Sequence, residues 1–464
     1  MLKIIFLFFM SGGLPVAIAM SGASLVYILW TGTTPPFAVF HRMISGIDSF
    51  PLLAVPFFIL AGNLMNNAGI TTRIYNYALA LVGWLRGGLG HVNVVGSVIF
   101  AGMSGTAIAD AAGLGTIEIK AMVEHGYEKE FAVGVTAASA TLGPIIPPSL
   151  PFVIYGMMAN VSIGALFLAG ILPGLLMAFL MMVTVTYFAH KNGWGGDVKF
   201  NWNRFGKAIA ETLIVIAWPL LMWVLIIKAE LPAQGTVCAG LIALFIADKL
   251  FKFQAVLPIM TPVLLIGGMS TGIFTPTEGA IAACVWAMVL GLGWYRTLSW
   301  RMFVKVCLDT VETTSTVLFI VAAASIFGWM LTATGVTSAL SAWVLGFTKE
   351  AWVFLLLANA LMLFVGCFLE PTAAITILVP LLVPICQQLG IDLVHFGLVM
   401  VLNLMIGLLH PPMGLVLFVL ARVAKLSVER TTMAILPWLV PLLGSLAIIT
   451  YVPTLVLWLP NLAK

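Results

Sequence analysis

Two segments of the form Gly-x-x-x-Pro-Pro, at 143–148 and 407–412, carry the clearest chemistry in the sequence. Proline has no N–H to donate and its ring clashes with the preceding helical turn, so a proline pair frees the carbonyl oxygens just before it. Freed carbonyls suit a small hard cation, and the N-terminus of the half-helix that follows suits a carboxylate. The pattern predicts a cation-coupled site for an anion, although a single break of this kind more often only kinks a helix.

A second kind of interruption precedes each proline pair. The apolar stretch 94–119 is broken at 103–106, and the stretch 353–385 is broken at 369–372. A helix broken at membrane depth leaves backbone groups unpaired, and these are tolerated only inside protein or beside a water-filled cavity. Both breaks therefore predict the tips of re-entrant helical hairpins.

Four hydroxyl side chains stand at these breaks and could add ligands to either site: Ser104, Thr106, Ser149 and Thr372. Taken singly, each is equally open to a structural role, because serine and threonine in membrane helices commonly bond a carbonyl of their own helix.

Acidic residues within apolar sequence are costly and therefore mark candidate functional positions. Glu370 stands at the second tip, where Thr106 stands at the first, and Asp110 lies one turn past the first tip. Glu278 follows a Thr-Pro-Thr sequence typical of a helix start, so we expect a first-turn acid stabilised by the helix dipole. His410 directly precedes the second proline pair, and we expect it to be a packed, neutral histidine.

A sequence repeat relates the two regions. A shift of 264 residues superposes Gly102 on Gly366, Gly126 on Gly390, Gly143 on Gly407, Pro147 on Pro411 and Pro148 on Pro412. In this register both hairpin breaks and both proline pairs coincide. Paired interrupted helices in two halves of a membrane protein are the best sequence indication of a transport site near the midplane.

The composition indicates the environment of these elements. Of 464 residues, 62% are hydrophobic and 8% are charged, whereas a soluble domain carries about a quarter of its residues as charges. A helix needs about 20 apolar residues to cross the hydrocarbon, so the length predicts an all-α polytopic membrane protein with on the order of a dozen crossings. Spans are expected near 4–30, 51–67, 74–87, 131–158, 163–190, 212–228, 234–250, 272–294, 308–332, 395–422 and 433–459. The stretch 253–271 fits either a surface helix or a short span.

Loop charge predicts the orientation of the hairpins. Basic residues concentrate in 191–207 and 422–430, which the positive-inside rule places in the cytoplasm. The loop 120–130 also contains lysines and is expected on that side, whereas its repeat counterpart, 386–394, contains no Lys or Arg and is expected in the periplasm. The two hairpins would then enter the membrane from opposite faces, as inverted repeats. Three parts of the chain are predicted: a first repeat at 1–190, connecting helices at 191–271 and a second repeat at 272–464.

Several other classes of function find little support. The five cysteines lie singly in apolar stretches, no GxxxxGK[ST] or HExxH occurs, and the net charge of +4 is ordinary for membrane-protein loops. We therefore expect no transition-metal site, no ATP hydrolysis and no nucleic-acid partner. Gly102-Met103-Ser104-Gly105 fits the GxSG of rhomboid-type intramembrane serine proteases, with His125, His190, His395 and His410 as candidate bases, but four residues are a weak signal.

At its motifs the sequence resembles the large membrane subunit of TRAP (tripartite ATP-independent periplasmic) transporters, the DctM type. The matching stretches run from the second span almost to the end of the chain: LAVPFFILAG (53–62), GMSGTAIAD (102–110), IPPS (146–149), GIFTPTE (272–278), HFG (395–397) and Asn403 through Gly407 to the prolines at 411 and 412.

This resemblance implies a sodium-coupled, elevator-type transporter of the bacterial inner membrane that imports an organic acid. It also implies two partners, a small four-helix membrane subunit and a periplasmic substrate-binding protein. Carried over residue by residue, two or more sodium ions should involve Ser104, Gly105, Thr106, Gly143 and Ile146 at the first site, and Gly366, Thr372, Gly407 and His410 at the second. The substrate should lie near Ser104, Ser149, Glu370, Thr372 and a small-residue helix break that contains Ser325 and Gly328.

The chain departs from the family pattern at two of these positions, where the family commonly has Asp in place of Glu370 and Thr in place of His410. The second departure leaves the backbone carbonyl as the expected ligand at 410. A stand-alone sodium–carboxylate symporter of similar hairpin architecture, without partner chains, remains an alternative. Sialic acids, C4-dicarboxylates and sugar acids all remain open as substrates.

Overall fold

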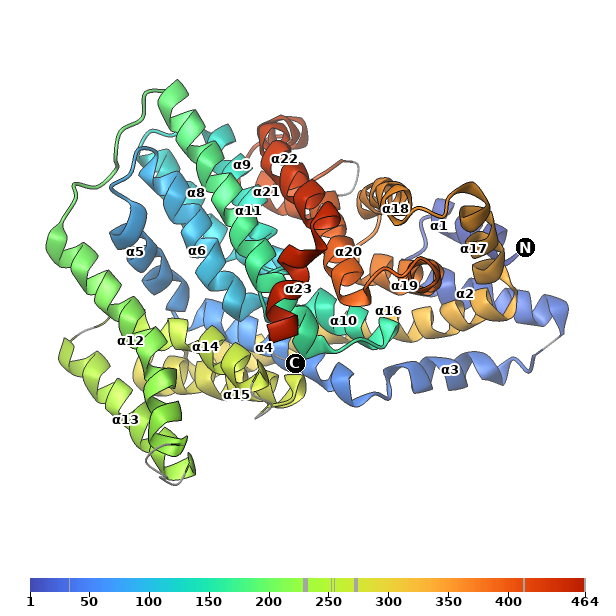
Figure 1. Cartoon of the computed structure of the whole chain (residues 1–464), viewed down its shortest axis with the longest axis horizontal. Helices are drawn as coiled ribbons and strands as arrows, with labels where there is room; N and C mark the ends of the chain where they lie inside the picture. The colour runs from blue at the N-terminus through green and yellow to red at the C-terminus, as the bar shows by residue number, and fades with distance from the viewer. Residues whose placement is uncertain are drawn as a thin grey trace.

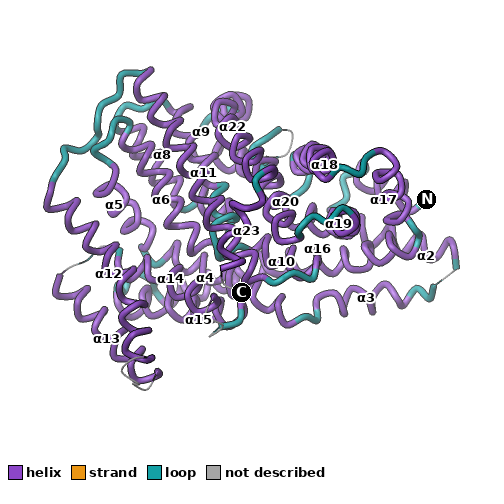
Figure 2. The backbone as a smooth tube through the Cα atoms, viewed as in Figure 1, coloured by secondary structure: helices purple, strands orange, loops and turns teal. Residues whose placement is uncertain are grey.

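The computed structural model describes residues 1–32, 34–227, 233–251, 253, 255–270, 274–411 and 414–462. All regular elements in these ranges are helical, as Figure 2 shows, and an isolated bridge joins Arg86 to Gly196. The predicted all-helical class is therefore confirmed. Pro412 of the second proline pair, and Gly272 and Ile273 of the fourth matching stretch, lie outside the described residues.

The helices of the first part of the chain include the first predicted hairpin. In order they are α1 Leu2–Ser11, α2 Val16–Thr31, α3 Phe37–Ile47, the short 3-10 helix η1 Phe50–Leu53, α4 Ala54–Asn67, α5 Ile70–Val82, α6 Gly88–Ser104, α7 Ala107–Ala112, α8 Leu114–Glu124, α9 Lys129–Ala140, α10 Leu150–Ala159 and α11 Ile163–Lys191. Helices α1–α3 lie at the opposite end of the molecule from α6 and α8 (Figure 1).

The remaining helices include the second predicted hairpin. They are α12 Trp202–Ile227, α13 Ala233–Phe251, α14 Val256–Ser270, α15 Pro276–Met288, the π-helix η2 Val289–Trp294, α16 Trp300–Ala333, α17 Val336–Phe347, α18 Ala351–Gly366, α19 Pro371–Gln388, α20 Leu393–Gly407, α21 Leu415–Ala424, α22 Val428–Tyr451 and α23 Pro453–Leu462.

Seven of the described helical segments are long and apolar enough to cross a membrane: Phe50–Asn67, Ile163–Lys191, Trp202–Met222, Pro276–Trp294, Trp300–Ala333, Pro371–Gln388 and Val428–Tyr451. Shorter apolar helices such as α6, α10, α18, α20 and α21 accompany them. Short helices are expected beside the breaks, because a helix interrupted halfway leaves arms too short to span by themselves; the exception is α19, which begins at the second break and is 18 residues long.

Two expected spans are wrong as single helices. The stretch 4–30 is divided between α1 and α2, which pack on each other, because Gly13 takes a left-handed φ of +79° and Pro15 stands at the N-cap of α2. Glycine tolerates this conformation, and proline favours a helix start. The stretch 433–459 is likewise divided, since α22 ends at Tyr451 and α23 begins at Pro453.

The core that positions the two hairpins is formed where the broken helices meet. The largest buried apolar cluster joins α9, α10, α11, α20 and α22, with Phe152, Tyr155, Phe396 and Trp438 among its fully buried side chains. The long helix α16 runs beneath this core in Figure 1 and contacts α2, α3, α4 and α19. Side chains from both predicted repeats therefore share one packed interior.

Candidate functional site

A cavity of about 350 Å³ lies where the ends of both helix pairs meet. Residues from α4, the α6–α7 connection, α10, the start of α19 and α20 line it, together with Thr313 and Val317 of α16. Its polar lining residues are Asn63, Asn66, Ser104, Thr106, Thr313, Glu370 and Thr372. Four residues named from the sequence are thus brought together: Ser104 and Thr106 of the first break, and Glu370 and Thr372 of the second. The two pairs are more than 260 positions apart in the chain.

The first tip is a tight turn between α6 and α7. Gly105 follows Ser104 with a left-handed φ of +63°, and Thr106 caps α7 by accepting the N–H of Ala109 at 3.3 Å. A Cβ on Gly105 would lie 2.7 Å from the carbonyl oxygen of Pro148, so both the backbone conformation and the space require glycine. The Gly105 carbonyl also accepts the N–H of Leu150 at 3.4 Å, which attaches the tip to the start of α10.

The second tip lies between α18 and α19. Glu370 caps α19, because its Oε2 accepts the N–H of Ala373 at 3.2 Å. The hydroxyl of Thr372 donates to Oε1 of the same carboxylate at 2.8 Å. Glu370 therefore takes the same capping position as Thr106, but both of its oxygens are engaged within the tip.

The first proline pair lies in an irregular stretch between α9 and α10. Ser149 caps α10 by accepting the N–H of Phe152 at 3.3 Å, while its hydroxyl donates to the Pro144 carbonyl at 2.5 Å. The carbonyls of Gly143 and Ile146 accept no backbone hydrogen bond from the described residues. Gly143 packs against the first tip, since a Cβ added at Gly143 would lie 3.0 Å from the backbone carbonyl oxygen of Thr106. The break therefore exposes acceptor oxygens beside the tip.

At the second break, helices α18 and α20 touch through their backbones. A Cβ on Gly407 would lie 2.6 Å from the Cα and carbonyl carbon of Gly366, and one on Gly366 would lie 3.2 Å from the Cα of Gly407. After Gly407 the chain turns, and the Leu408 and His410 carbonyls face Gly414, the residue before α21. Nδ1 of His410 lies 3.1 Å from the Ile406 carbonyl, so the ring packs back on its own helix end.

The other predicted residues lie farther from the cavity lining. Ile146 packs against Gly174, and Gly366 and Gly407 lie behind the second tip. Ser325 packs against Gly46 of α3, and Gly328 faces Pro380 at 3.5 Å. The helix break expected around Ser325 and Gly328 is wrong, because α16 is continuous from Trp300 to Ala333. Small residues in this segment permit close packing against α3 and α19 without interrupting the helix.

Helix α4 contributes polar residues that the sequence reasoning missed. Gly62 lets α4 pack closely against the first tip. A Cβ added at Gly62 would lie 3.2 Å from the backbone carbonyl oxygen of Ser104. Asn63 donates to Thr310 at 3.1 Å, and the Oδ1 of Asn66 is buried without a hydrogen-bond partner among the described residues. The hydroxyl of Ser104 is also buried without a hydrogen-bond partner among the described residues. These residues could have been found from the sequence, because the asparagines of LAGNLMNN (60–67) stand in an apolar stretch, where polar side chains mark candidate functional positions.

Two buried acids stand in the second arm of the first helix pair. Glu118 accepts the amide of Asn93 at 2.6 Å, and that amide also donates to Thr136 at 2.8 Å. Ser139 donates to the Asn93 carbonyl at 2.7 Å. One oxygen of Glu118 and one of Asp110 have no hydrogen-bond partner among the described residues. This network joins α6, α8 and α9 behind the cavity.

The histidines offered as bases for a serine nucleophile are engaged elsewhere. Ring nitrogens of all four lie within hydrogen-bond distance of backbone carbonyls: His125 of Ala121, His190 of Thr186, His395 of Ile449 and His410 of Ile406. The hydroxyl of Ser104 has no partner among the described residues. The site therefore lacks the nucleophile–base pair that a serine protease requires.

The helices define a polytopic α-helical membrane protein. Its fold is similar to that of the Alcanivorax borkumensis YdaH transporter, whose crystal structure was described as having an unusual topology, with a TM-score of 0.56 over 89% of this chain and 87% of that one, at 15% identity. The class is thus a multi-span helical protein with a fold found in a solved transporter.

Residues 3–455 match the family described as "Tripartite ATP-independent periplasmic transporter, DctM component", and the chain belongs to this family. It is 41% identical over 450 residues to the sialic acid TRAP transporter large permease protein SiaM of Vibrio cholerae, covering 97% of this chain and 95% of that one. It is 34% identical over 465 residues to the C4-dicarboxylate TRAP transporter large permease protein DctM of Rhodobacter capsulatus, covering 97% and 96%. The chain is therefore a multi-pass transporter permease and not an enzyme.

Proposed function

We propose that this chain is the large permease of a sodium-coupled secondary transporter that imports an organic acid. The observation that carries the proposal is the cavity in which both tips meet, since Ser104 and Thr106 enter it from one helix pair and Glu370 and Thr372 from the other. Broken helices around a shared central site are the arrangement that secondary transporters use to bind an ion and a substrate together.

The cation half of the proposal is supported by oxygen atoms that lack partners. The buried Ser104 hydroxyl lies at the first tip and Gly143 packs beside it, and the carbonyls of Gly143 and Ile146 accept no backbone hydrogen bond from the described residues. Hard cations such as sodium bind through oxygen ligands, and unwound backbone beside a half-helix supplies them without added negative charge. We propose Ser104, Gly105, Thr106, Gly143 and Ile146 for one sodium ion and Gly366, Thr372, Gly407 and His410 for another.

The anion half is supported by two helix starts. Leu150 and Pro151 of α10 and Pro371 and Thr372 of α19 line the cavity, so two helix N-termini face it. The positive dipole ends of these helices favour a carboxylate. Ser104, Ser149, Glu370 and Thr372 are the proposed substrate neighbours on this side, with Ser325 and Gly328 retained from the family resemblance. The two proposed sodium ions would offset the charges of the Glu370 carboxylate and of one substrate carboxylate.

An inverted repeat with elevator movement is the proposed mechanism. Thr106 and Glu370, related by the 264-residue shift, both cap the second arm of their helix pair. Gly126 and Gly390, related by the same shift, both have positive φ, +86° and +69°. We propose that 1–190 and 272–464 form the two repeats, that 191–271 connects them, and that the tips with their broken helices move together past the other helices.

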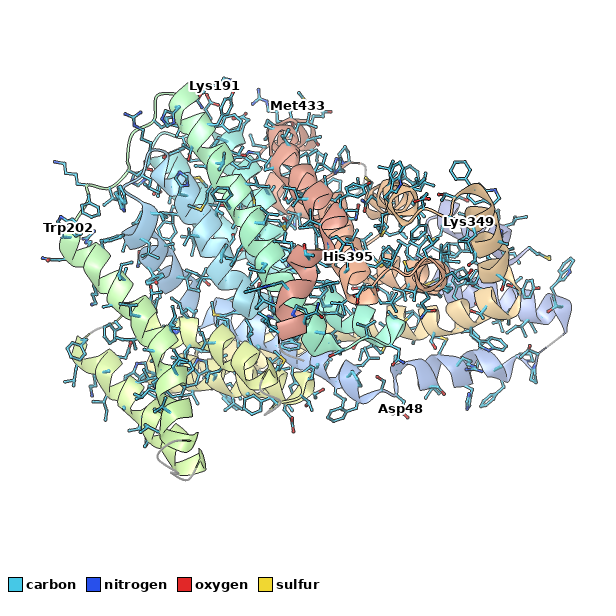
Figure 3. All side chains as sticks on the ribbon, in the orientation of Figure 1. Asp48, Lys191, Trp202, Lys349, His395 and Met433 are labelled. Atoms are coloured by element: carbon cyan, nitrogen blue, oxygen red, sulfur yellow. The ribbon has the colours of Figure 1, made fainter. Side chains whose placement is uncertain are left out.

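The proposed topology agrees with the placement of the basic segments. Lys191 and Met433, which adjoin the basic segments 191–207 and 422–430, lie at the same edge of the molecule, whereas Asp48 lies at the opposite edge (Figure 3). This supports a common cytoplasmic side for the two basic segments.

Two partner chains belong to the proposal. The family description names a tripartite periplasmic system, of which the matched component is one. We propose a small four-helix membrane subunit that enlarges the stationary part and a periplasmic binding protein that delivers the substrate. The two relatives are named for different acids, sialic acid and C4-dicarboxylates, so the shared class is a carboxylate. Mass spectrometry of the molecule that co-purifies with the binding protein would identify it.

Sodium coupling is tested by uptake into proteoliposomes that contain the complete system. An inward sodium gradient should drive accumulation without ATP, and choline in place of sodium should abolish it. Uptake that is undiminished in choline would refute the coupling. The stand-alone symporter is tested in the same assay, because robust uptake by this chain without its partners would favour that alternative.

A further inference from the structure

A second cavity, of about 300 Å³, lies where α5, the loop 192–201 and the start of α12 meet, and it shares no lining residue with the central cavity. Three basic side chains line it, Lys199, Arg204 and Lys207. Figure 3 labels Trp202, at the start of α12, beside this position. The pocket therefore lies between α5 of the first proposed repeat and the connecting part 191–271.

The loop that carries Lys199 is held in place by hydrogen bonds. Asp197 accepts the N–H of Leu89 at 2.8 Å and the hydroxyl of Tyr127 at 2.6 Å. The N–H of Val198 donates to the Gly83 carbonyl at 3.3 Å. One wall of the pocket is thus fixed by contacts with α6 and with the α5–α6 connection, so its basic residues are presented by ordered backbone.

The charge balance of the pocket favours an anion. Glu211 is the one acid among its lining residues, and it is buried, with Oε2 accepting the N–H of Ala255 at 3.0 Å. Asn201 adds a helix start, because its Oδ1 accepts the N–H groups of Asn203 and Arg204. Lys199 and Arg204, beside this helix start, give the exposed side of the pocket a positive charge.

An aromatic cluster surrounds the pocket. The ring of Phe200 lies 5.1 Å from that of Trp84, 4.9 Å from that of Trp202 and 5.5 Å from that of Phe205. Trp202 is 75% exposed although it is a large apolar side chain. Tryptophan and its neighbours gather at membrane–water interfaces, where one side of the ring is apolar and the other wet.

The position of the pocket relative to the membrane can be inferred from α12. A row of exposed apolar side chains on this membrane-crossing helix begins at Ile209 and continues through Leu213, Ile216 and Leu220. Ile209 is five residues beyond Arg204, a rise of about 7.5 Å along a helix. Arg204 and Lys199 therefore lie just outside the apolar zone, at the level of lipid headgroups.

We propose that this pocket binds the phosphate headgroup of an anionic phospholipid. Basic pockets between helices at the cytoplasmic surface suit such headgroups. A neighbouring basic cavity fits this role less well, because Arg73 there lies over the Tyr295 ring at 3.8 Å and Asp248 accepts the indole N–H of Trp294 at 2.8 Å. Arg73 is thus engaged by an aromatic ring and Asp248 adds a negative charge to that lining, whereas Lys199 and Arg204 are exposed at the headgroup level.

The test is lipid retention by the full-length chain, purified with any subunit that accompanies it and measured by native mass spectrometry. Dioleoyl phosphatidylglycerol should bind more tightly than dioleoyl phosphatidylcholine. The double variant Lys199→Gln/Arg204→Gln should weaken phosphatidylglycerol binding by roughly 20- to 30-fold, since each basic residue near an anionic lipid contributes about fivefold. The matched control Lys425→Gln/Arg430→Gln, in an exposed basic segment elsewhere, should leave binding within about twofold.

Three results would overturn the proposal: equal retention of the two lipids, an equal loss in the control variant, or displacement of phosphatidylglycerol by inorganic phosphate that itself binds without lipid. The last result would assign the pocket to a free anion. The charge-conserving variant Lys199→Arg/Arg204→Lys should retain phosphatidylglycerol, which separates charge from folding. If the glutamine variant does not fold, added salt should weaken phosphatidylglycerol retention by the unmodified chain and leave phosphatidylcholine unchanged; equal salt effects on the two lipids would contradict the proposal.

Discussion

The two tips that meet at the central cavity occupy corresponding positions but are built differently. The first turns through a single left-handed glycine, Gly105, and its Ser104 hydroxyl has no partner among the described residues. The second contains Cys367, Phe368 and Leu369 before the cap, and its cap carboxylate is satisfied by Thr372 and a backbone N–H. The two tips therefore differ although their positions correspond: the first has a side-chain oxygen without a hydrogen-bond partner among the described residues, and the second has a carboxylate that is hydrogen-bonded within the tip.

The support behind each tip differs as well. Behind the first, the amide of Asn93 joins Glu118, Thr136 and Ser139. Behind the second, Asn403 donates to Asn359 at 2.7 Å, the rings of Phe354 and Phe396 lie 6.3 Å apart, and the backbones of Gly366 and Gly407 touch. One pair of helices is held by a network containing an acid, and the other by close backbone contact. We expect the two halves to respond differently to the same kind of substitution.

The largest expected effect concerns orientation and is all-or-none. Because Gly126 and Gly390 have positive φ, cysteines are better placed at the neighbouring exposed positions His125 and Gln388. In a background without native cysteines, His125→Cys should react with an impermeant maleimide only after the membrane is opened. Gln388→Cys should react in sealed right-side-out vesicles. Labelling of both from one side would make the repeat parallel or accidental and remove the geometric basis of the mechanism.

Gly407→Ala should abolish uptake and lower the free energy of unfolding by about 1–3 kcal/mol, because the added methyl meets backbone that cannot yield. The reason is the 2.6 Å separation between its Cβ position and Gly366. Thermal unfolding and proteoliposome uptake measure the two effects. The control is Gly444→Ala in α22, where nothing lies within 4 Å; similar losses in both variants would show that the contact has no special role.

Ser104→Ala should raise the half-saturating sodium concentration by about tenfold, since one proposed oxygen ligand is lost, and should change thermal stability little. Ser445→Ala is the control, because Ser445 is also buried but bonds the Pro441 carbonyl of its own helix. Sodium titration of uptake distinguishes the two variants. An unchanged sodium dependence in Ser104→Ala would remove this hydroxyl from the proposed site.

The smallest effects test the equivalence of the caps. Thr106→Ala and Glu370→Ala should each lower the free energy of unfolding by about 1 kcal/mol, as expected for removal of an N-cap acceptor. Glu370→Gln should lose less, because an amide oxygen can still accept the Ala373 N–H. Denaturation of the three variants in one detergent provides the measurement. A loss in Glu370→Gln equal to that in Glu370→Ala would mean that charge, and not capping, stabilises the second tip.

The breaks that shape the cavity could be predicted from the sequence because their causes are local. Proline and glycine act on their own turn of helix, so the interruptions between α9 and α10 and between α20 and α21 follow from Gly143, Pro147, Gly407 and Pro411. Glu278 was expected in the first turn of a helix for the same reason and lies there, where it also forms a capping box with Thr275.

Other features depend on what a segment packs against. Ser325 and Gly328 were expected to break a helix, but with α3 and α19 packed on them they lie inside the continuous α16. The amphipathic helix α3 at Phe37–Ile47 was missed because it is too short to read as a span. The polar network of Asn93 could not be assigned from sequence either, since its partners come from two other helices, α8 and α9.

The contact between Gly366 and Gly407 also limits how this sequence can change over generations. Compensation within a contacting pair requires that one residue can shrink when the other grows. At the corresponding position of the first half, a Cβ on Gly102 would meet the ring of Pro262 at 2.6 Å, and a smaller residue at 262 could make room for it. Gly366 and Gly407 have no side chain that could be made smaller. A substitution at either therefore cannot be compensated by a second substitution at the other, and can be rescued only by displacement of a whole helix.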